Sequence, residues 1–139
     1  MVAYLDSSVL LQHILKGDEG IRQVMICDRI ISSELLEIEC KRVLHRYRLQ
    51  GYLDDVKFIA AMDRLDNILE GVSLLLLSQR IKMRSAQSFP VIIKTLDALH
   101  LSSAIIFNEE FPDESLLLFT YDNQLNRCAR VLDFTTPFS

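Results

Sequence analysis

Short apolar runs are separated along this chain by longer stretches in which apolar residues recur every three or four positions. Such runs are typical of buried strands, whereas the periodic stretches are typical of helices that pack on a sheet. The runs are Val2–Leu5, Ile30–Ile31, Val72–Leu77, Leu116–Phe119 and Val131–Phe134. Val72–Leu77 is the most hydrophobic of them, so we expect it to form a central strand. Strands that alternate with helices predict an α/β fold of three layers, with a mostly parallel sheet and helices on both faces.

Glycines and capping residues mark the ends of the expected helices. Gly17, Gly51 and Gly71 stand where three helices end. The expected N-caps are Ser32 or Ser33, Asp54 or Asp55, and Thr95. In chain order the expected helices are Ser7–Leu15, Glu19–Cys27, Glu34–Arg48, Asp55–Gly71, Ser78–Ala86, Leu96–Phe107 and Asn123–Ala129.

The composition is that of one globular domain over residues 1–139. Half of the residues are hydrophobic and 24% are charged, which excludes a disordered chain. The formal net charge is −4, so the chain as a whole has no attraction for nucleic acid. A nucleic-acid partner would therefore have to be bound by a local basic patch and by metal ions.

Cysteine usage and hydropathy predict a cytoplasmic protein. The three cysteines, Cys27, Cys40 and Cys128, are scattered and lack the spacing of a zinc site. We interpret them as small apolar residues in a reducing compartment. The N-terminus has no signal-peptide pattern, and no apolar run approaches the roughly 20 residues of a membrane helix. We therefore expect no membrane partner.

Four acidic residues stand at positions where α/β proteins carry chemistry. Asp6 follows the first strand, and Asp122 follows the strand Leu116–Phe119. Asp97 lies in the first turn of a helix, and Glu39 lies on a helix among apolar residues. Taken singly, each has an ordinary explanation: a helix cap, a helix-dipole partner, or an ion pair of Glu39 with a nearby arginine.

Taken together, the four carboxylates predict a metal site. The carboxyl ends of parallel strands lie at one edge of the sheet, where α/β proteins bind their ligands. Like charges at that edge repel one another unless a cation neutralises them. Oxygen ligands without a histidine and cysteine cluster favour Mg²⁺ or Mn²⁺ over zinc.

Four stretches of the chain resemble the acidic motifs of the PIN-domain family. They are YLDSSVLL (Tyr4–Leu11), SSELLEIECKRVLHR (Ser32–Arg46), TLDALHLSSA (Thr95–Ala104) and TYDNQLNRCA (Thr120–Ala129). Their order and spacing resemble in particular the single-domain ribonuclease toxins of the VapC type. The resemblance extends from Val2 to about Leu132, with TLDALHLSSA as its most specific part.

The resemblance implies a PIN-like fold and metal-dependent hydrolysis of RNA phosphodiester bonds. The catalytic, metal-binding acids would be Asp6, Glu39, Asp97 and Asp122, with Ser8 and Thr120 as supporting residues. For a toxin of this type, the resemblance also implies a cognate antitoxin protein and a homodimer. The helices Glu34–Arg48 and Asp55–Gly71 are our candidates for these protein contacts.

Two further assignments concern the surroundings of the acids. Arg42 and Arg46 share a helical face with Glu39, so we expect them to contact phosphate or a protein partner. His100 follows Asp97 by about one helical turn. We expect it to pack and form hydrogen bonds in the wall of the site, because a metal-bound hydroxide needs no additional base.

Two other classes of α/β protein with acids at strand ends do not fit this sequence. A phosphoaccepting receiver needs an acid at the end of its third strand, whereas Val72–Leu77 is followed by Ser78 and Gln79. The D-x-D motif of haloacid-dehalogenase-like phosphatases is absent, because two serines follow Asp6. A catalytically silent PIN-like interaction module and an RNA-processing nuclease that is not a toxin remain open alternatives.

Overall fold

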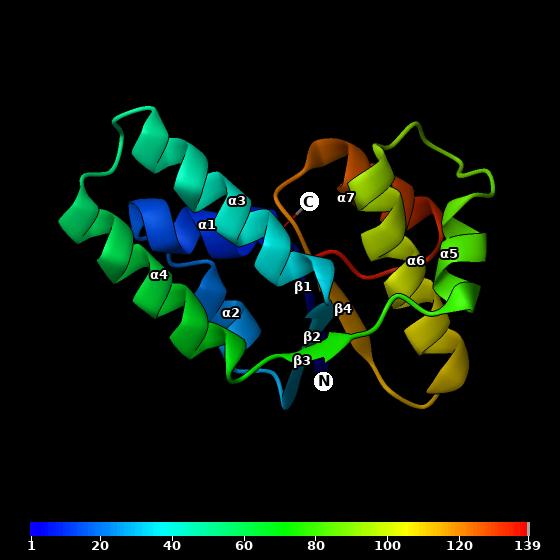
Figure 1. Cartoon of the computed structure of the whole chain (residues 1–139). Helices are drawn as coiled ribbons and strands as arrows, with labels where there is room; N and C mark the ends of the chain where they lie inside the picture. The colour runs from blue at the N-terminus through cyan, green and yellow to red at the C-terminus, as the bar shows by residue number, and fades with distance from the viewer. Residues whose placement is uncertain (139) are drawn as a thin grey trace.

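The computed structural model describes residues 1–138 and has a four-stranded sheet between two groups of helices (Figure 1). The strands are β1 (Val2–Leu5), β2 (Arg29–Ser33), β3 (Ser73–Leu75) and β4 (Leu116–Phe119). They pair in parallel in the order β3-β2-β1-β4. The helices are α1 (Ser7–Lys16), α2 (Ile21–Met25), α3 (Leu35–Leu49), α4 (Asp55–Leu69), α5 (Gln79–Ser85), α6 (Thr95–Glu110) and α7 (Asn123–Val131). The predicted three-layer α/β fold is confirmed.

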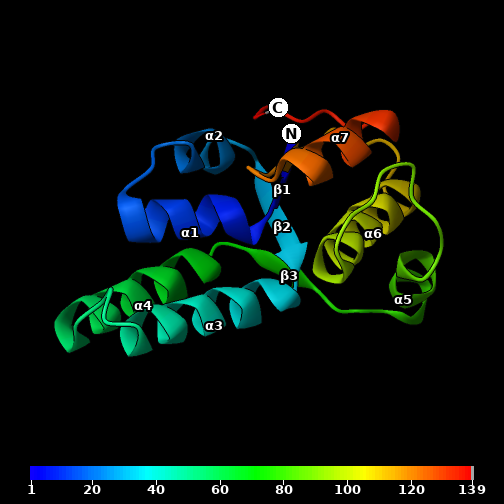
Figure 2. The same ribbon diagram turned by 90° about the horizontal axis from the view of Figure 1, so that it is seen from above.

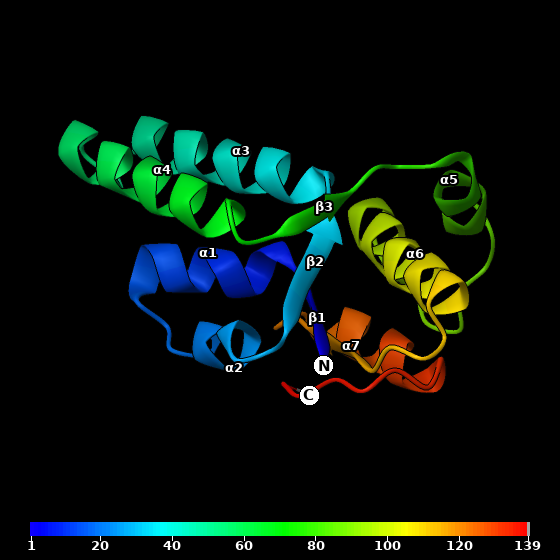
Figure 3. The same ribbon diagram turned by 90° about the horizontal axis from the view of Figure 1, so that it is seen from below.

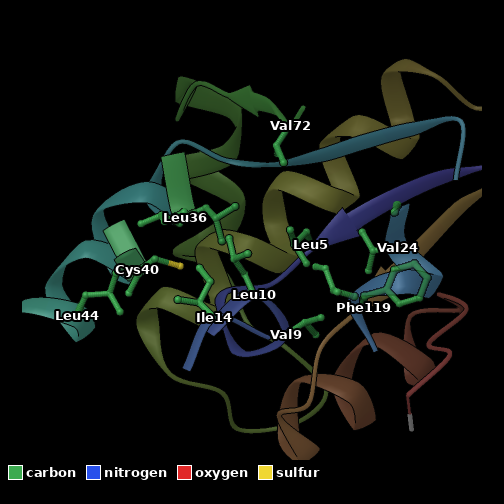
Figure 4. Packing of buried hydrophobic residues seen from close by; sticks show 14 residues of the cluster. Leu5, Val9, Leu10, Ile14, Val24, Leu36, Cys40, Leu44, Val72 and Phe119 are labelled. Atoms are coloured by element: carbon green, nitrogen blue, oxygen red, sulfur yellow. The ribbon is translucent and has the colours of Figure 1, made fainter. Parts of the chain in front are cut away.

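Strand β1 lies inside the sheet, and its side chains alternate between two apolar clusters. Ala3 and Leu5 pack in the cluster that contains the buried residues of α1 to α4 (Figure 4). Val2 and Tyr4 pack in the other cluster, with residues of α6 and α7. Figure 2 shows these two groups of helices on opposite sides of the sheet. Full burial of a leucine contributes about 1.5–3 kcal/mol, so two such clusters fix the strand firmly.

Side-chain caps begin several of the helices. Asp6, Asp54, Ser78 and Asp122 each accept a hydrogen bond from a backbone N–H in the first turn of the helix that follows. Such caps contribute about 1 kcal/mol each. Asp6 and Asp122 therefore have a structural role, and this role uses only part of the hydrogen-bonding capacity of each carboxylate.

One predicted strand is shorter and lies elsewhere in the sheet than expected, and another is absent from the described residues. Within Val72–Leu77 only Ser73–Leu75 is a strand, and it lies at the edge of the sheet rather than at its centre. Its apolar side chains are half-buried because it has a neighbouring strand on one side alone. Val131–Phe134 forms no strand: Val131 ends α7, and the chain then makes one isolated bridge between Leu117 and Thr135.

Several helix ends also differ from the prediction. Neither Ser32 nor Ser33 is the N-cap residue of α3. Strand β2 extends through both serines, and Glu34 takes the N-cap position. Thr95 is the first residue of α6, and Lys94 precedes it as the N-cap without a side-chain hydrogen bond. Helix α2 covers only Ile21–Met25 of the predicted Glu19–Cys27.

Helices α3 and α4 form a hairpin that reaches past α1 on one side of the sheet (Figure 3). The hairpin packs on α1 through buried residues such as Leu44 and Leu65. Its other faces carry exposed apolar side chains, among them Ile38, Leu49, Val56 and Ile59. Within residues 1–138, none of the helices combines the length and the apolar character that a membrane crossing requires.

Candidate active site

The four predicted acids line one hollow of about 440 Å³. Asp6 directly follows β1, and Asp122 lies three residues after the end of β4. Glu39 comes from α3 and Asp97 from the first turn of α6. A slightly larger hollow, of about 480 Å³, lies near Met1 and Leu116 at the other end of the strands, away from these acids. The acids therefore meet at the carboxyl edge, where parallel sheets bind ligands.

Asp6 is 4% exposed and is held through one of its two carboxylate oxygens. Its Oδ2 accepts hydrogen bonds of 2.7 Å from the hydroxyl groups of Ser8 and Thr120. The Ser8 hydroxyl in turn accepts from the backbone N–H of Tyr121, which links β1 to the segment after β4. The two predicted supporting residues thus contact Asp6 directly, and Oδ1 remains available.

Asp122 also accepts a hydrogen bond through only one carboxylate oxygen, whereas the Asp97 carboxylate accepts none from the described residues. The Asp122 Oδ1 atom accepts from the backbone N–H of Leu125 at 2.8 Å. Its own N–H donates to the Thr120 hydroxyl at 3.0 Å. Among residues 1–138, no group forms a hydrogen bond or an ion pair with the Asp97 carboxylate. The hollow therefore contains carboxylate oxygens without protein partners.

Glu39 reaches the hollow from the second turn of α3, with a side chain that is 16% exposed. Its Oε1 forms a short hydrogen bond with Nε2 of His100, and its Oε2 accepts from the Ser7 hydroxyl at 3.3 Å. The His100 Nδ1 lies 2.8 Å from the Tyr4 hydroxyl. His100 is completely buried and hydrogen-bonded, as expected, and it lies behind Glu39 rather than among the residues that line the hollow.

The charges of the acids act on one another. Burial, together with the charges of Asp6 and Asp122, raises the pKa of Asp97 to about 6. Burial lowers the pKa of His100, but its hydrogen bond to Glu39 and the surrounding carboxylates outweigh burial, so this pKa lies above its ordinary value. The site holds more negative charge than its own residues neutralise.

This donor set fits a hard divalent cation. Mg²⁺ is typically bound by one or two carboxylates and several waters rather than by a closed protein cage. In residues 1–138 no three His, Cys, Asp or Glu side chains are already arranged to hold a metal ion. The acids instead form an open cluster, in which free oxygens and mutual repulsion favour an added cation.

The structure does not bring Arg42 and Arg46 into this hollow. They line a separate hollow of about 340 Å³ on the outer side of α3, beside Leu49. Both side chains are exposed, and neither forms an ion pair within residues 1–138. Glu39 pairs with His100 rather than with either arginine, so the alternative of a solvated ion pair for Glu39 is wrong.

Four further residues line the acidic hollow that were not predicted from the sequence to do so: Ser7, Lys94, Thr95 and Leu96. Lys94 lines it as the residue before α6, and Ser7 lines it beside Asp6. Ser7 could have been found as the neighbour of Asp6 at a helix start. Lys94 had no such signal, because a single lysine after a loop is an ordinary surface residue. Lys94 is the one cationic side chain that lines the described hollow.

The fold and the site together define an α/β protein with an acidic centre at the carboxyl edge of its sheet. The chain belongs to the PIN domain family, which matches residues 3–131. Its structure is similar to that of VapBC2 from Rickettsia felis bound to a DNA fragment from their promoter, with a TM-score of 0.69 and 15% sequence identity. The similarity covers 98% of this chain and 97% of that one. The chain matches none of the curated proteins with which it was compared.

Proposed function

We propose that this PIN domain is an endoribonuclease that needs Mg²⁺ or Mn²⁺, and that it is the toxin of a type II toxin–antitoxin pair. The observation that carries the proposal is the group of four carboxylates lining one hollow, of which Asp6 and Asp122 are each held through a single oxygen. Asp6, Glu39 and Asp97 would bind the cation, and Asp122 would bind it directly or through water. Ser8 and Thr120 would keep Asp6 in place.

The chemistry of the proposed reaction is hydrolysis of a phosphodiester bond. A bound divalent ion would lower the pKa of a water molecule and stabilise the charge that develops on the phosphate. The carboxylates of this chain would orient the hydrated ion, and the burial of Asp6 and His100 would keep solvent away from that side of the site. Water would attack the phosphorus in line with the 3′-oxygen, and the bond between phosphorus and that oxygen would break, so the products would carry a 3′-hydroxyl and a 5′-phosphate.

Titration of the purified chain with Mn²⁺ and Mg²⁺ by calorimetry, with cleavage of single-stranded RNA followed in parallel, tests the proposal. We expect binding of the ion, cleavage that EDTA stops, and 5′-phosphate product ends. Single-stranded DNA of the same sequence is the control substrate. Absence of metal binding would contradict the nuclease and favour an interaction module.

Substitution of Lys94 tests the contact with the substrate. Lys94 is the one cationic residue among those that line the hollow, so its amine would bind a phosphate oxygen of the RNA. We expect Lys94→Ala to lower kcat/KM for RNA by about 10-fold and to leave Mn²⁺ affinity unchanged or slightly higher, because a positive charge opposes cation binding. The matched control is Lys82→Ala, which removes an exposed lysine of α5. Unchanged cleavage by Lys94→Ala would contradict this role.

A protein partner and a homodimer are part of the proposal for a toxin. The exposed apolar side chains of the α3–α4 hairpin support such contacts, because apolar surface of this kind is stabilised when another surface covers it. The structurally similar VapBC2 supports an antitoxin as one partner. Arg42 and Arg46 lie on the same helix, where they would contact an acidic segment or phosphate.

We expect light scattering after size-exclusion chromatography to give twice the mass of 16.0 kDa. Substitution of two apolar residues of the hairpin, Leu49→Ser and Val56→Ser, is expected to shift the population toward the monomer, because both side chains are exposed in the single chain. A monomer at every concentration would show that the dimer is wrong. Toxicity on expression, relieved by a co-expressed neighbouring gene, would separate a toxin from an RNA-processing nuclease.

A further inference from the structure

Three side chains from different elements form a hydrogen-bonded row that ends in the acidic hollow. Tyr4 lies on β1, His100 on α6 and Glu39 on α3. The Tyr4 hydroxyl lies 2.8 Å from Nδ1 of His100, and Nε2 of the same ring bonds to Oε1 of Glu39. The tyrosine and histidine rings also meet edge to face, at 83°. Tyr4 and His100 are buried and Glu39 is nearly so, which fixes the geometry of the row.

The direction of the hydrogen bonds follows from the chemistry of the two ends. An ionised carboxylate only accepts, so Nε2 of His100 must carry the hydrogen that it donates to Glu39. Burial raises the pKa of Tyr4, so the phenol keeps its proton. The Tyr4 hydroxyl donates to Nδ1 when the ring is neutral and accepts from Nδ1–H when the ring is protonated. Tyr4 thus fixes the orientation of a ring whose other nitrogen faces the acid. A ring flip would break both hydrogen bonds.

The row leaves Glu39 with one held oxygen and one freer oxygen. Its Oε2 has only the 3.3 Å contact from Ser7, in the wall of the hollow. Asp6 shows the same division, because Oδ2 is held by two hydroxyl groups while Oδ1 lies 4.0 Å from Nε2 of His100. His100 therefore stands between the two acids and limits the positions that the Glu39 carboxylate can take.

We propose that Tyr4 and His100 are positioning residues, which hold Oε1 of Glu39 so that its second oxygen stays available to the divalent cation. The proposal rests on the proposed function, because it takes Glu39 as a ligand of that ion. Neither residue contacts the substrate or the reacting water in this role. Outer groups that orient a ligand typically change metal affinity by 10- to 100-fold when they are removed.

The test compares the unsubstituted chain with Tyr4→Phe, His100→Gln, His100→Ala and Glu39→Gln. Tyr4→Phe removes one hydroxyl and keeps the ring in the core. Glutamine can place an N–H near the position of Nε2, whereas alanine cannot. Tyr47→Phe, a tyrosine of α3 outside the row, is the matched control. For each variant, Mn²⁺ affinity is measured by calorimetry and the free energy of unfolding by urea titration. In the variants that keep His100, the ring nitrogens of the three histidines are also observed by NMR, without metal and at one fixed pH.

Weaker Mn²⁺ binding at comparable unfolding free energy is the expected result. We expect a loss of about 3- to 10-fold for Tyr4→Phe and 10- to 100-fold for His100→Ala, with partial recovery in His100→Gln. The ring nitrogen signals of His100 should shift in Tyr4→Phe and in Glu39→Gln, and stay unchanged in Tyr47→Phe. A purely structural role would lower stability and leave the affinity of the folded protein unchanged.

Two results would overturn the proposal, and they differ from failure of the proposed function. If the parent binds Mn²⁺ and Tyr4→Phe and His100→Gln bind it equally well, the positioning role is wrong while the metal site stands. If the His100 signals do not respond to Glu39→Gln, the hydrogen bond between His100 and Glu39 is absent in solution, and the positioning role is wrong whether or not the chain binds Mn²⁺. If the parent binds no Mn²⁺ but the signals respond, the row holds Glu39 and the proposed function is wrong.

Discussion

Replacement of Asp6 by asparagine is expected to abolish RNA cleavage, with a loss of roughly 10³-fold or more, and to weaken Mn²⁺ binding by at least about 100-fold. Asp6 is the most deeply buried of the four acids and lies beside His100, between the ends of β1 and β4. Asparagine keeps the shape and removes the charge. It is also a good N-cap, so α1 should still form.

The control for this substitution is Asp63→Asn, which makes the same chemical change at an exposed position on α4. It should bind Mn²⁺ and cleave RNA as the parent does. Far-ultraviolet circular dichroism and urea unfolding show whether the Asp6→Asn chain is folded. A folded Asp6→Asn variant that cleaves RNA at the rate of the parent would exclude Asp6 from the reaction.

Replacement of Asp97 by asparagine is expected to stabilise the metal-free protein and to remove most of its response to metal. The pKa of this carboxyl is raised to about 6 in the folded chain, from 3.8 for an ordinary Asp. The folded state therefore binds this proton more tightly than the unfolded state does. Stability falls as the pH rises from about 4 to 6, and the full penalty is present above pH 6.

The size of this penalty is modest because the carboxylate is partly exposed. After a discount for solvent screening we expect about 1 kcal/mol, or a Tm that is about 2–4 °C higher for metal-free Asp97→Asn at pH 7.5. With Mn²⁺ present, the parent should have the higher Tm, since only the parent gains the full stabilisation by binding the ion. Differential scanning fluorimetry with EDTA and with Mn²⁺ measures both. A lower Tm for Asp97→Asn in EDTA would contradict the repulsion between the acids.

The acids at the strand ends could be located from the sequence because their positions depend on local patterns. A short apolar run followed by Asp6, and another followed by Asp122, predict two strand ends, and parallel strands end at one edge. The structure agrees for both β1 and β4. The order of the strands could not be predicted in this way. The high hydrophobicity of Val72–Leu77 predicted a central strand. Hydrophobicity does not specify which strands are neighbours, and β3 lies at the edge of the sheet with its leucines half-buried.

The partners of the acids were harder to predict because they come from distant parts of the chain. His100 packs and forms hydrogen bonds, as expected, but it lies behind Glu39 and not among the residues that line the hollow, and its contact with Glu39 joins residues 61 positions apart. No local pattern contains that pairing. Lys94 was missed for the same reason, since its place in the hollow depends on how the loop before α6 packs.

The acids lie at positions 6, 39, 97 and 122, and β1 pairs with β4 from the far end of the chain. Any fragment that ends before β4 lacks Asp122 as well as Thr120, one of the two hydroxyl groups that hold Asp6. Because domains fold as units, a chain under synthesis has a complete site only when its last quarter is available. A nuclease whose acids are distributed in this way would be inactive as a growing chain. A cut within β4 would inactivate it by separating Asp122 from the other three acids.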